Sequence, residues 1–141
     1  MIIFDYENLE YKGFLTPFTA IYMGASKDDV KNLDVMIYDF YSNSIILKDV
    51  PIENLLSMFD ILKKTVVDKQ SFDVNIDINV EVDCNVRYHK DDYVTLGFAR
   101  ERFDFYDENF DELKRDIENA VDWIKQFSTK QTSKLTNNEN E

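Results

Sequence analysis

The longest regular pattern in the chain is an alternation of apolar and polar residues that runs from Phe72 to His89. The even positions from Val74 to Tyr88 are apolar, and the odd positions carry acids, asparagines and one arginine. A period of two is typical of a β-strand with one buried face and one solvated face. Sixteen residues at ~3.4 Å each would span about 54 Å, although a compact chain of this length is only about 37 Å across. We therefore expect this strand to bend, break or project.

The next segment, Tyr93–Phe105, is predicted to be the antiparallel partner of this strand. Its apolar phase changes between Phe98 and Phe103, and a bulge near 97–99 would restore a common apolar face. That bulge would place two arginines opposite two acids, namely Arg100 opposite Asp83 and Arg102 opposite Glu81. Cross-strand pairs of this kind contribute roughly 0.2–1 kcal/mol each. The sequence thus offers ordinary partners for two acids of the polar face.

Two further segments have the period of amphipathic helices. Pro51 opens the first, where its missing amide hydrogen costs nothing. The apolar stripe of this helix consists of Ile52, Leu55, Leu56, Phe59 and Leu62. Asp107 is a suitable N-cap for the second helix, which we expect to run to about Phe127. Its apolar face consists of Phe110, Leu113, Ile117, Ala120, Val121, Ile124 and Phe127.

Shorter apolar runs in the first half predict additional strands: Ile2–Tyr6, Phe18–Met23, and a hairpin made of Leu33–Tyr41 and Ser44–Val50. The predicted fold class is α+β, with an antiparallel sheet of several strands covered by two helices. The expected order is strands, helix, two long strands and a C-terminal helix. We expect a single acidic domain over residues 1–127 and a disordered polar tail over residues 128–141.

Composition indicates whether such a domain can form a stable core and in which cellular compartment it is expected. The chain has 141 residues, of which 44% are hydrophobic, so one core can stabilise it. The single cysteine excludes an intramolecular disulfide, and the first residues lack the basic start of a signal peptide. No apolar run approaches the ~20 residues of a membrane helix. We therefore expect an intracellular, cytoplasmic protein.

Side chains for nucleophilic or nucleotide chemistry are sparse. Cys84 has the apolar phase of its strand, which predicts a buried residue rather than a thiolate nucleophile. His89 is the only histidine and lies in a predicted turn, so no triad or histidine-rich zinc site can be built around it. The few glycines do not have the spacing of a phosphate-binding loop. We expect no cofactor and no enzymatic activity.

A metal-dependent phosphoesterase built from Asp77, Glu81 and Asp83 is the least favoured alternative, because that strand offers no nearby lysine or histidine. The acids around the start of the second helix also have an ordinary explanation, since acids stabilise helix N-termini by about 0.3–1 kcal/mol each. Their spacing does not fit a calcium-binding loop.

The net charge of −12 favours a basic partner and opposes direct binding to nucleic acid or anionic membranes. Acids on a regular strand or helix turn can imitate the phosphates of DNA, which lie ~3.4 Å apart along each strand. Nine acids lack an obvious basic neighbour and form the predicted partner-binding set: Asp73, Asp77, Asp91, Asp92, Asp104, Asp107, Glu108, Asp111 and Glu112. The leading hypothesis is a non-enzymatic inhibitor that occupies the nucleic-acid-binding surface of a basic protein. In size and charge alone, the chain resembles small acidic phage anti-defence proteins, including anti-CRISPR proteins, and toxin-immunity proteins.

A second hypothesis is an interaction or adaptor module, which could be homodimeric. It rests on arginines and aromatic residues, the types that most often anchor interfaces. Its candidate surface consists of Tyr88, Tyr93, Arg100, Arg102 and Tyr106. Salt separates the two hypotheses, because charge mimicry requires binding that weakens steeply as ionic strength rises.

Overall fold

The computed structural model describes residues 9–139 apart from 28, 30, 70–72 and 91, and it describes side chains as far as Gln131. In the described chain, four strands and a helix are followed by four more strands and a second helix. The first unit contains β1 (Tyr11–Thr16), β2 (Thr19–Ala25), β3 (Asn32–Asp39), β4 (Ser44–Pro51) and α1 (Ile52–Asp68). The second contains β5 (Asp73–Asp77), β6 (Asp83–His89), β7 (Tyr93–Phe98), β8 (Glu101–Tyr106), the 3-10 turn η2 (Asp107–Asn109) and α2 (Phe110–Glu139).

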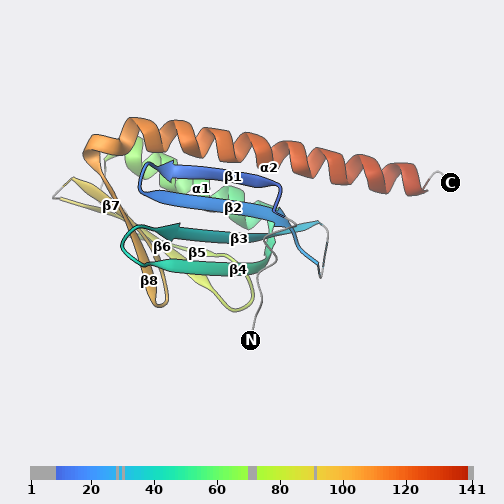
Figure 1. Ribbon diagram of the computed structural model, residues 1–141, viewed down its shortest axis with the longest axis horizontal. Helices are drawn as coiled ribbons and strands as arrows, with labels where there is room; N and C mark the ends of the chain where they lie inside the picture. The colour runs from blue at the N-terminus through green and yellow to red at the C-terminus, as the bar shows by residue number, and fades with distance from the viewer. Residues whose placement is uncertain (1–8, 28, 30, 70–72, 91, 140–141) are drawn as a thin grey trace.

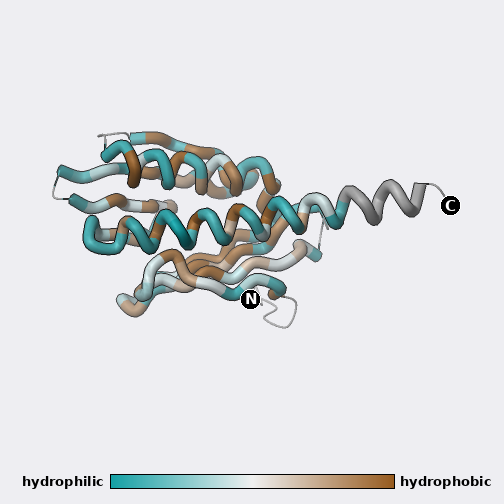
Figure 2. The backbone as a smooth tube through the Cα atoms, turned by 90° about the horizontal axis from the view of Figure 1, so that it is seen from above, coloured by the Kyte–Doolittle hydropathy of each residue, from teal (hydrophilic) through white to brown (hydrophobic). Residues whose placement is uncertain are grey.

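Each set of four strands forms its own antiparallel meander, so the α+β class is confirmed with two sheets instead of one. The first sheet has the order β1-β2-β3-β4, and the second has the order β5-β6-β7-β8. α1 packs against the inner face of the second sheet and against β4, while α2 packs along β1 and α1 (Figure 1). Seen from above, hydrophobic positions recur along α2 between hydrophilic ones (Figure 2), as the amphipathic period predicts.

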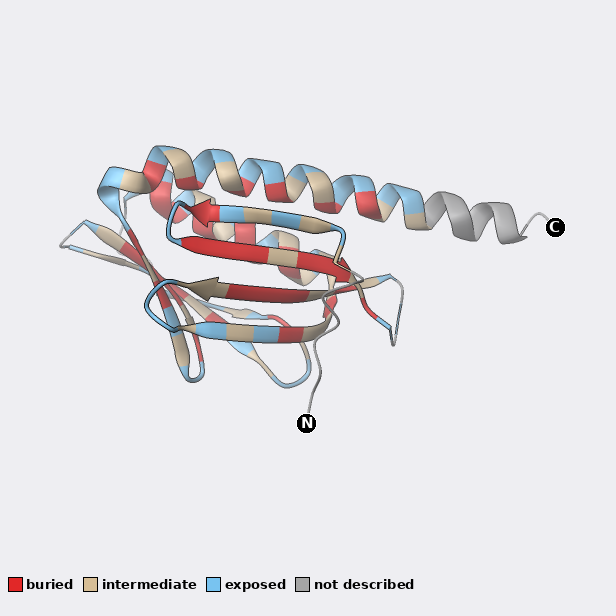
Figure 3. Ribbon diagram, in the orientation of Figure 1, coloured by how far each residue is buried: buried red, intermediate tan, exposed pale blue. Residues whose placement is uncertain are grey.

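The core is one continuous cluster to which both sheets and both helices contribute. β2 and β3, in the middle of the first sheet, are mostly buried, whereas β1 and β4 are partly exposed (Figure 3). In the second sheet, the inner face carries Val86, Leu96 and Phe103, all fully buried. At the end of α1, Lys69 takes a left-handed conformation (φ 50°) and its N–H donates to the Thr65 carbonyl at 3.0 Å, which closes the helix.

The long alternating strand is broken, which was one of the three predicted outcomes. β5 ends at Asp77 and β6 begins at Asp83. Between them, the Asn79 side-chain oxygen accepts the backbone N–H of Glu81 at 2.9 Å and of Val82 at 2.8 Å, which forms a tight turn. The even side of the pattern packs inward as expected, except at Val80, which is fully exposed at the tip of this turn.

The predicted bulge near 97–99 is wrong, and so are the two ion pairs derived from it. Ala99 and Arg100 form a hairpin turn between β7 and β8, and Arg102 lies opposite Gly97. Asp83 instead lies opposite Asp77 on β5. A two-residue turn and a bulge produce the same change of apolar phase, because directly opposed residues of a hairpin share one face of the sheet.

The boundaries also differ at the two ends of the chain. The strand β1 had no predicted counterpart, and the predicted strand Ile2–Tyr6 lies outside the described residues. The backbone of α2 continues to Glu139, so most of the segment predicted as a disordered tail has helical backbone. Phe127 is nevertheless the last buried residue among the described side chains, which is why the apolar period ends there.

Candidate functional site

The outer face of the second sheet carries the polar residues of the alternating pattern. Strand register places Asp73, Arg87, Thr95 and Asp104 in one row across the four strands. The row nearest the β6–β7 turn consists of His89, Tyr93 and Tyr106. The polar face therefore carries both acidic and basic side chains, because Arg87 lies within its longest row, next to Asp73.

The aromatic row is built by direct packing. The His89 and Tyr93 rings stack with their centroids 4.2 Å apart, and the Tyr93 and Tyr106 centroids are 5.7 Å apart. The His89 ring Nε2 also forms a hydrogen bond with the Thr95 hydroxyl, which is buried although it belongs to the outer face. Tyr88, from the same predicted surface, points to the opposite side of its strand, and Arg100 lies in the β7–β8 turn.

Five of the nine predicted acids come together at one end of the molecule, and we call this group the end cluster: Asp92, Asp107, Glu108, Asp111 and Glu112. The Asp107 N–H donates to the Asp92 carbonyl at 2.8 Å, which joins the β6–β7 turn to the start of η2. Lys69 Nζ lies 2.8 Å from Asp107 Oδ1, and this hydrogen bond raises the pKa of Lys69. Asp91 lies outside the described residues.

One more contact ties the end cluster to the sheet. The Tyr88 hydroxyl donates to Asp92 Oδ1 at 3.0 Å. The pKa of Tyr88 is raised, mainly because the side chain is partly buried and secondarily because of this hydrogen bond. Asp92 and Asp107 thus have partners within the fold, whereas Glu108, Asp111 and Glu112 have no ion pair among the described residues.

The remaining acids of the set lie elsewhere, so the nine do not form one continuous surface. Asp73 and Asp77 are on β5, at the far edge of the second sheet. Asp73 is opposite Arg87, and its Oδ1 accepts a hydrogen bond from Asn85 Nδ2 at 2.5 Å. Asp77 is opposite Asp83, which is a like-charge pair.

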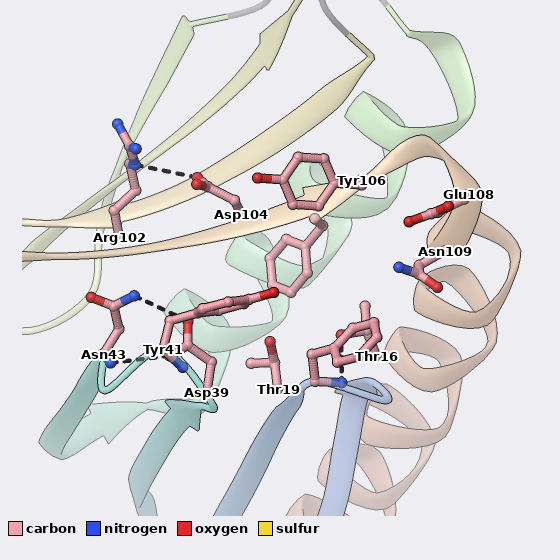
Figure 4. A pocket seen from close by; sticks show the side chains of 12 residues that line it. Thr16, Thr19, Asp39, Tyr41, Asn43, Arg102, Asp104, Tyr106, Glu108 and Asn109 are labelled. Carbon is pink, nitrogen blue, oxygen red and sulfur yellow. Dashed lines mark hydrogen bonds and ion pairs between the residues drawn. The ribbon is translucent and has the colours of Figure 1, made fainter.

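Asp104 belongs to a cleft of about 490 Å³ between the second sheet and the turns at the end of the first sheet (Figure 4). Arg102, Asp104 and Tyr106 of β8 line one side together with Glu108 and Asn109. The β1–β2 turn (residues 16–19) and the β3–β4 turn (residues 39–43) line the other side. The cleft therefore joins members of both predicted surfaces, two from the acidic set and two from the arginine–aromatic set.

Exposed aromatic side chains gather around this cleft. Their exposed fractions are 46% for Phe18, 70% for Phe40, 74% for Tyr41 and 48% for Tyr106. Phe18 and Phe40 contact each other edge to face, with ring centroids 6.4 Å apart. Large apolar side chains exposed in a group mark binding surfaces more often than single ones do.

Carboxylates give the cleft its charge. Arg102 Nε is 3.2 Å from Asp104 Oδ1, but this oxygen is buried and has no hydrogen bond of good geometry. The Asp39 carboxylate is hydrogen-bonded within the β3–β4 turn, where its Oδ1 accepts hydrogen bonds from the N–H groups of Tyr41 and Asn43. Glu108 is exposed and is the acid in the cleft that is freest to meet a ligand.

Sequence reasoning missed Phe18, Phe40 and Tyr41. Phe40 and Tyr41 stand in a turn, between Asp39 and the polar residues Ser42 and Asn43. Turns are ordinarily made of small and polar residues, so two adjacent aromatic residues there were a usable signal. Phe18 follows Pro17 in the β1–β2 turn and gave the same signal.

Two candidate groups for catalysis can be located among the described residues. Asp77, Glu81 and Asp83 do not form a metal site, because no group of three described His, Cys, Asp or Glu residues is placed to hold an ion. Cys84 is 1% exposed, and burial raises the pKa of its thiol to about 12, so it is not an activated nucleophile. Among the described helices, none combines the length and the apolar character needed to cross a membrane.

Comparisons of the chain with protein-family models, with curated proteins and with solved structures found no match.

Proposed function

We propose that this protein is a non-enzymatic binding protein, which binds a basic partner protein through the cleft and the neighbouring end cluster. In the most specific form of this proposal, the protein is an inhibitor, because it occupies the surface with which its partner binds nucleic acid. The observation that carries the proposal is the meeting of exposed aromatic side chains with the carboxylates of Asp104 and Glu108 in one cleft.

The two kinds of residue would have different roles in such an interface. Aromatic anchors in a desolvated centre supply most of the binding energy of protein interfaces. Charges at the rim act chiefly on the rate of association and on the choice of partner. A net charge of −12 attracts basic proteins over long distances and disfavours nucleic acid itself.

The adaptor hypothesis shares this site, since Arg102 and Tyr106 line the same cleft. It differs in the expected partner, because an arginine–aromatic anchor would not require a basic surface. A homodimer through the cleft is the less favourable version, because two copies with a net charge of −12 each repel one another.

The test compares two triple charge reversals with the unmodified protein as bait in nuclease-treated lysate. The test variant carries Glu108→Lys, Asp111→Lys and Glu112→Lys. The matched control carries Glu10→Lys, Glu53→Lys and Asp122→Lys, which changes the net charge equally at exposed acids away from the cleft. The test variant changes three acids in the first turns of η2 and α2, whereas the control changes one acid in the first turn of α1, so the test variant should lose more helix stabilisation. Circular dichroism and melting temperature establish that both are folded.

We expect one basic protein to be retained by the unmodified protein and by the control, and lost by the test variant. A short DNA duplex should displace it, and retention should weaken steeply between about 50 and 500 mM salt. Equal retention by all three baits would contradict the acidic site. Retention that is insensitive to DNA and salt would favour the adaptor hypothesis.

A further inference from the structure

A β-sheet has two edge strands, and each edge presents backbone N–H and C=O groups that no neighbouring strand satisfies. As far as the structure describes the chain, its two sheets therefore have four edges, formed by β1, β4, β5 and β8. Three of these edges are protected in different ways, and the fourth runs beside the cleft.

The edge of β1 is covered by α2, which packs along it. The edge of β4 is interrupted, because Asp49 has a positive φ of 55°, Pro51 lacks an N–H, and Asn79 Nδ2 donates to the Lys48 carbonyl at 2.8 Å. The edge strand β5 is short and places the acids Asp73 and Asp77 in the solvent. Short length, bulges, proline and charge are the usual means by which proteins prevent pairing at edges.

β8 (Glu101–Tyr106) contains no proline and no bulge in its pairing with β7, and its charged residues Glu101, Arg102 and Asp104 are of both signs, so its edge is the least protected of the four. Among the described strands β8 pairs with β7 alone, and in the close view it lies between β7 and the cleft (Figure 4). Four residues from the last five positions of β8 line the cleft: Arg102, Asp104, Phe105 and Tyr106. The volume of about 490 Å³ falls within the 300–1,000 Å³ that is common for ligand sites.

We propose that the cleft binds an extended, basic segment of a partner protein, which adds to the second sheet as a strand antiparallel to β8. This inference rests on the proposed function and specifies how its site would work. In strand addition, backbone hydrogen bonds supply affinity and alternate side-chain pockets supply specificity. A six-residue segment would extend about 20 Å along the edge.

The side chains on the two faces of β8 determine which residue types the partner segment should carry. Arg102, Asp104 and Tyr106 point to the outer face, where Arg102 Nε lies 3.2 Å from Asp104 Oδ1, and Glu108 follows them. Lysine or arginine at alternate positions of the segment would meet these carboxylates. The positions of the segment between these basic residues would face Phe105 and the β1–β2 turn that contains Phe18, and they should be apolar. A second copy of this chain does not fit, because its own β8 carries Glu101 and Asp104 and its net charge is −12.

The test uses blocked hexapeptides and the full-length protein labelled with 15N. The parent peptide alternates lysine and valine (KVKVKV), and its acidic counterpart is EVEVEV. Two further peptides are N-methylated at alternate residues of KVKVKV, one in each phase, so that one of them loses the N–H groups that would face β8. The amide resonances and the hydrogen exchange of β8 report binding, and the α2 amides report contacts that involve the end cluster alone.

We expect KVKVKV to bind and to slow amide exchange at alternate residues of β8, and EVEVEV not to bind. One N-methylated peptide should bind like its parent, and the other about tenfold more weakly or worse, since it loses two or three backbone hydrogen bonds. Strand addition is overturned if both N-methylated peptides bind like the parent, if β8 exchange does not change, or if KVKVKV fails to bind. None of these outcomes decides the proposed function, which depends on the comparison of the charge-reversed baits.

Discussion

Replacing Asp77 with lysine should stabilise the protein, and the same replacement at Asp73 should destabilise it. Both acids are exposed, both are on β5, and both face the outer side of the second sheet. They differ in the residue opposite them, because Asp77 faces Asp83 and Asp73 faces Arg87. Asp77→Lys converts a like-charge pair into an opposite-charge pair, and Asp73→Lys does the reverse.

The size of each effect follows from the geometry of the pair. Directly opposed side chains in an antiparallel pair have Cβ atoms about 5 Å apart, and two unit charges about 6 Å apart interact by roughly 0.7 kcal/mol in water. Reversing the sign of one charge changes this by up to about 1.4 kcal/mol. Asp73→Lys also removes one of the two acceptors of Asn85 Nδ2, the other being Asn75 Oδ1, which adds at most about 0.5–1.5 kcal/mol to its cost.

The unfolding free energies of the two variants should therefore differ by about 1–4 kcal/mol, or roughly 3–12 °C in melting temperature for a chain of this size. Urea and thermal denaturation at low salt measure the difference, and 1 M salt should remove most of its Coulombic part. Because both substitutions change the net charge equally, relief of overall repulsion cancels in the comparison. Equal shifts of the two variants in the same direction would show that overall charge, and not strand register, controls stability here.

Three other changes test the core and the end of the chain. Burial of Cys84 should prevent its reaction with maleimides in the native protein at about pH 8, and rapid labelling would contradict its placement. Because the pKa of this thiol is raised from 9.0 to about 12, its contribution to stability is present below about pH 9 and lost toward about pH 12, so Cys84→Ala should reduce the alkaline loss of unfolding free energy. Phe59→Ala, at a fully buried position of α1, should cost about 3–5 kcal/mol in urea denaturation; a cost below about 1 kcal/mol would refute close packing there. Ending the chain after Phe127 should leave the melting temperature unchanged, and a lower value would show that the later turns of α2 are docked.

The parts of the fold with a clear period could be predicted from the sequence. The helix after Pro51, the helix that contains Phe110 and Phe127, and the β3–β4 hairpin all have regular apolar spacing and recognisable end signals. The division of the long strand at Asn79 could not be predicted, because alternation is maintained through the turn and Val80 has the apolar phase of a buried residue.

The cleft could not be predicted from the sequence, for a different reason. Its walls come from the β1–β2 turn, the β3–β4 turn and β8, which are distant in the chain. Their proximity depends on how the two sheets are placed around α1, and no local pattern encodes that placement. The sequence did identify residues on one wall, since Asp104, Arg102 and Tyr106 were all candidates before their common location was known.

The acids of the second half fall into two groups once their partners are known. Asp73, Asp92, Asp104 and Asp107 contact Asn85, Tyr88, Arg102 and Lys69 respectively, so local structure is enough to explain them. Asp77 and Asp83 oppose each other, and Glu108 is exposed beside an aromatic cleft without an ion pair among the described residues. Solubility is served by an acid almost anywhere on the surface, so it does not explain acids placed face to face at a cost in stability. In the proposed complex, Glu108 is therefore the acid from which the footprint of a basic partner should be sought, whereas Asp77 and Asp83 lie on β5 and β6, away from the cleft beside β8.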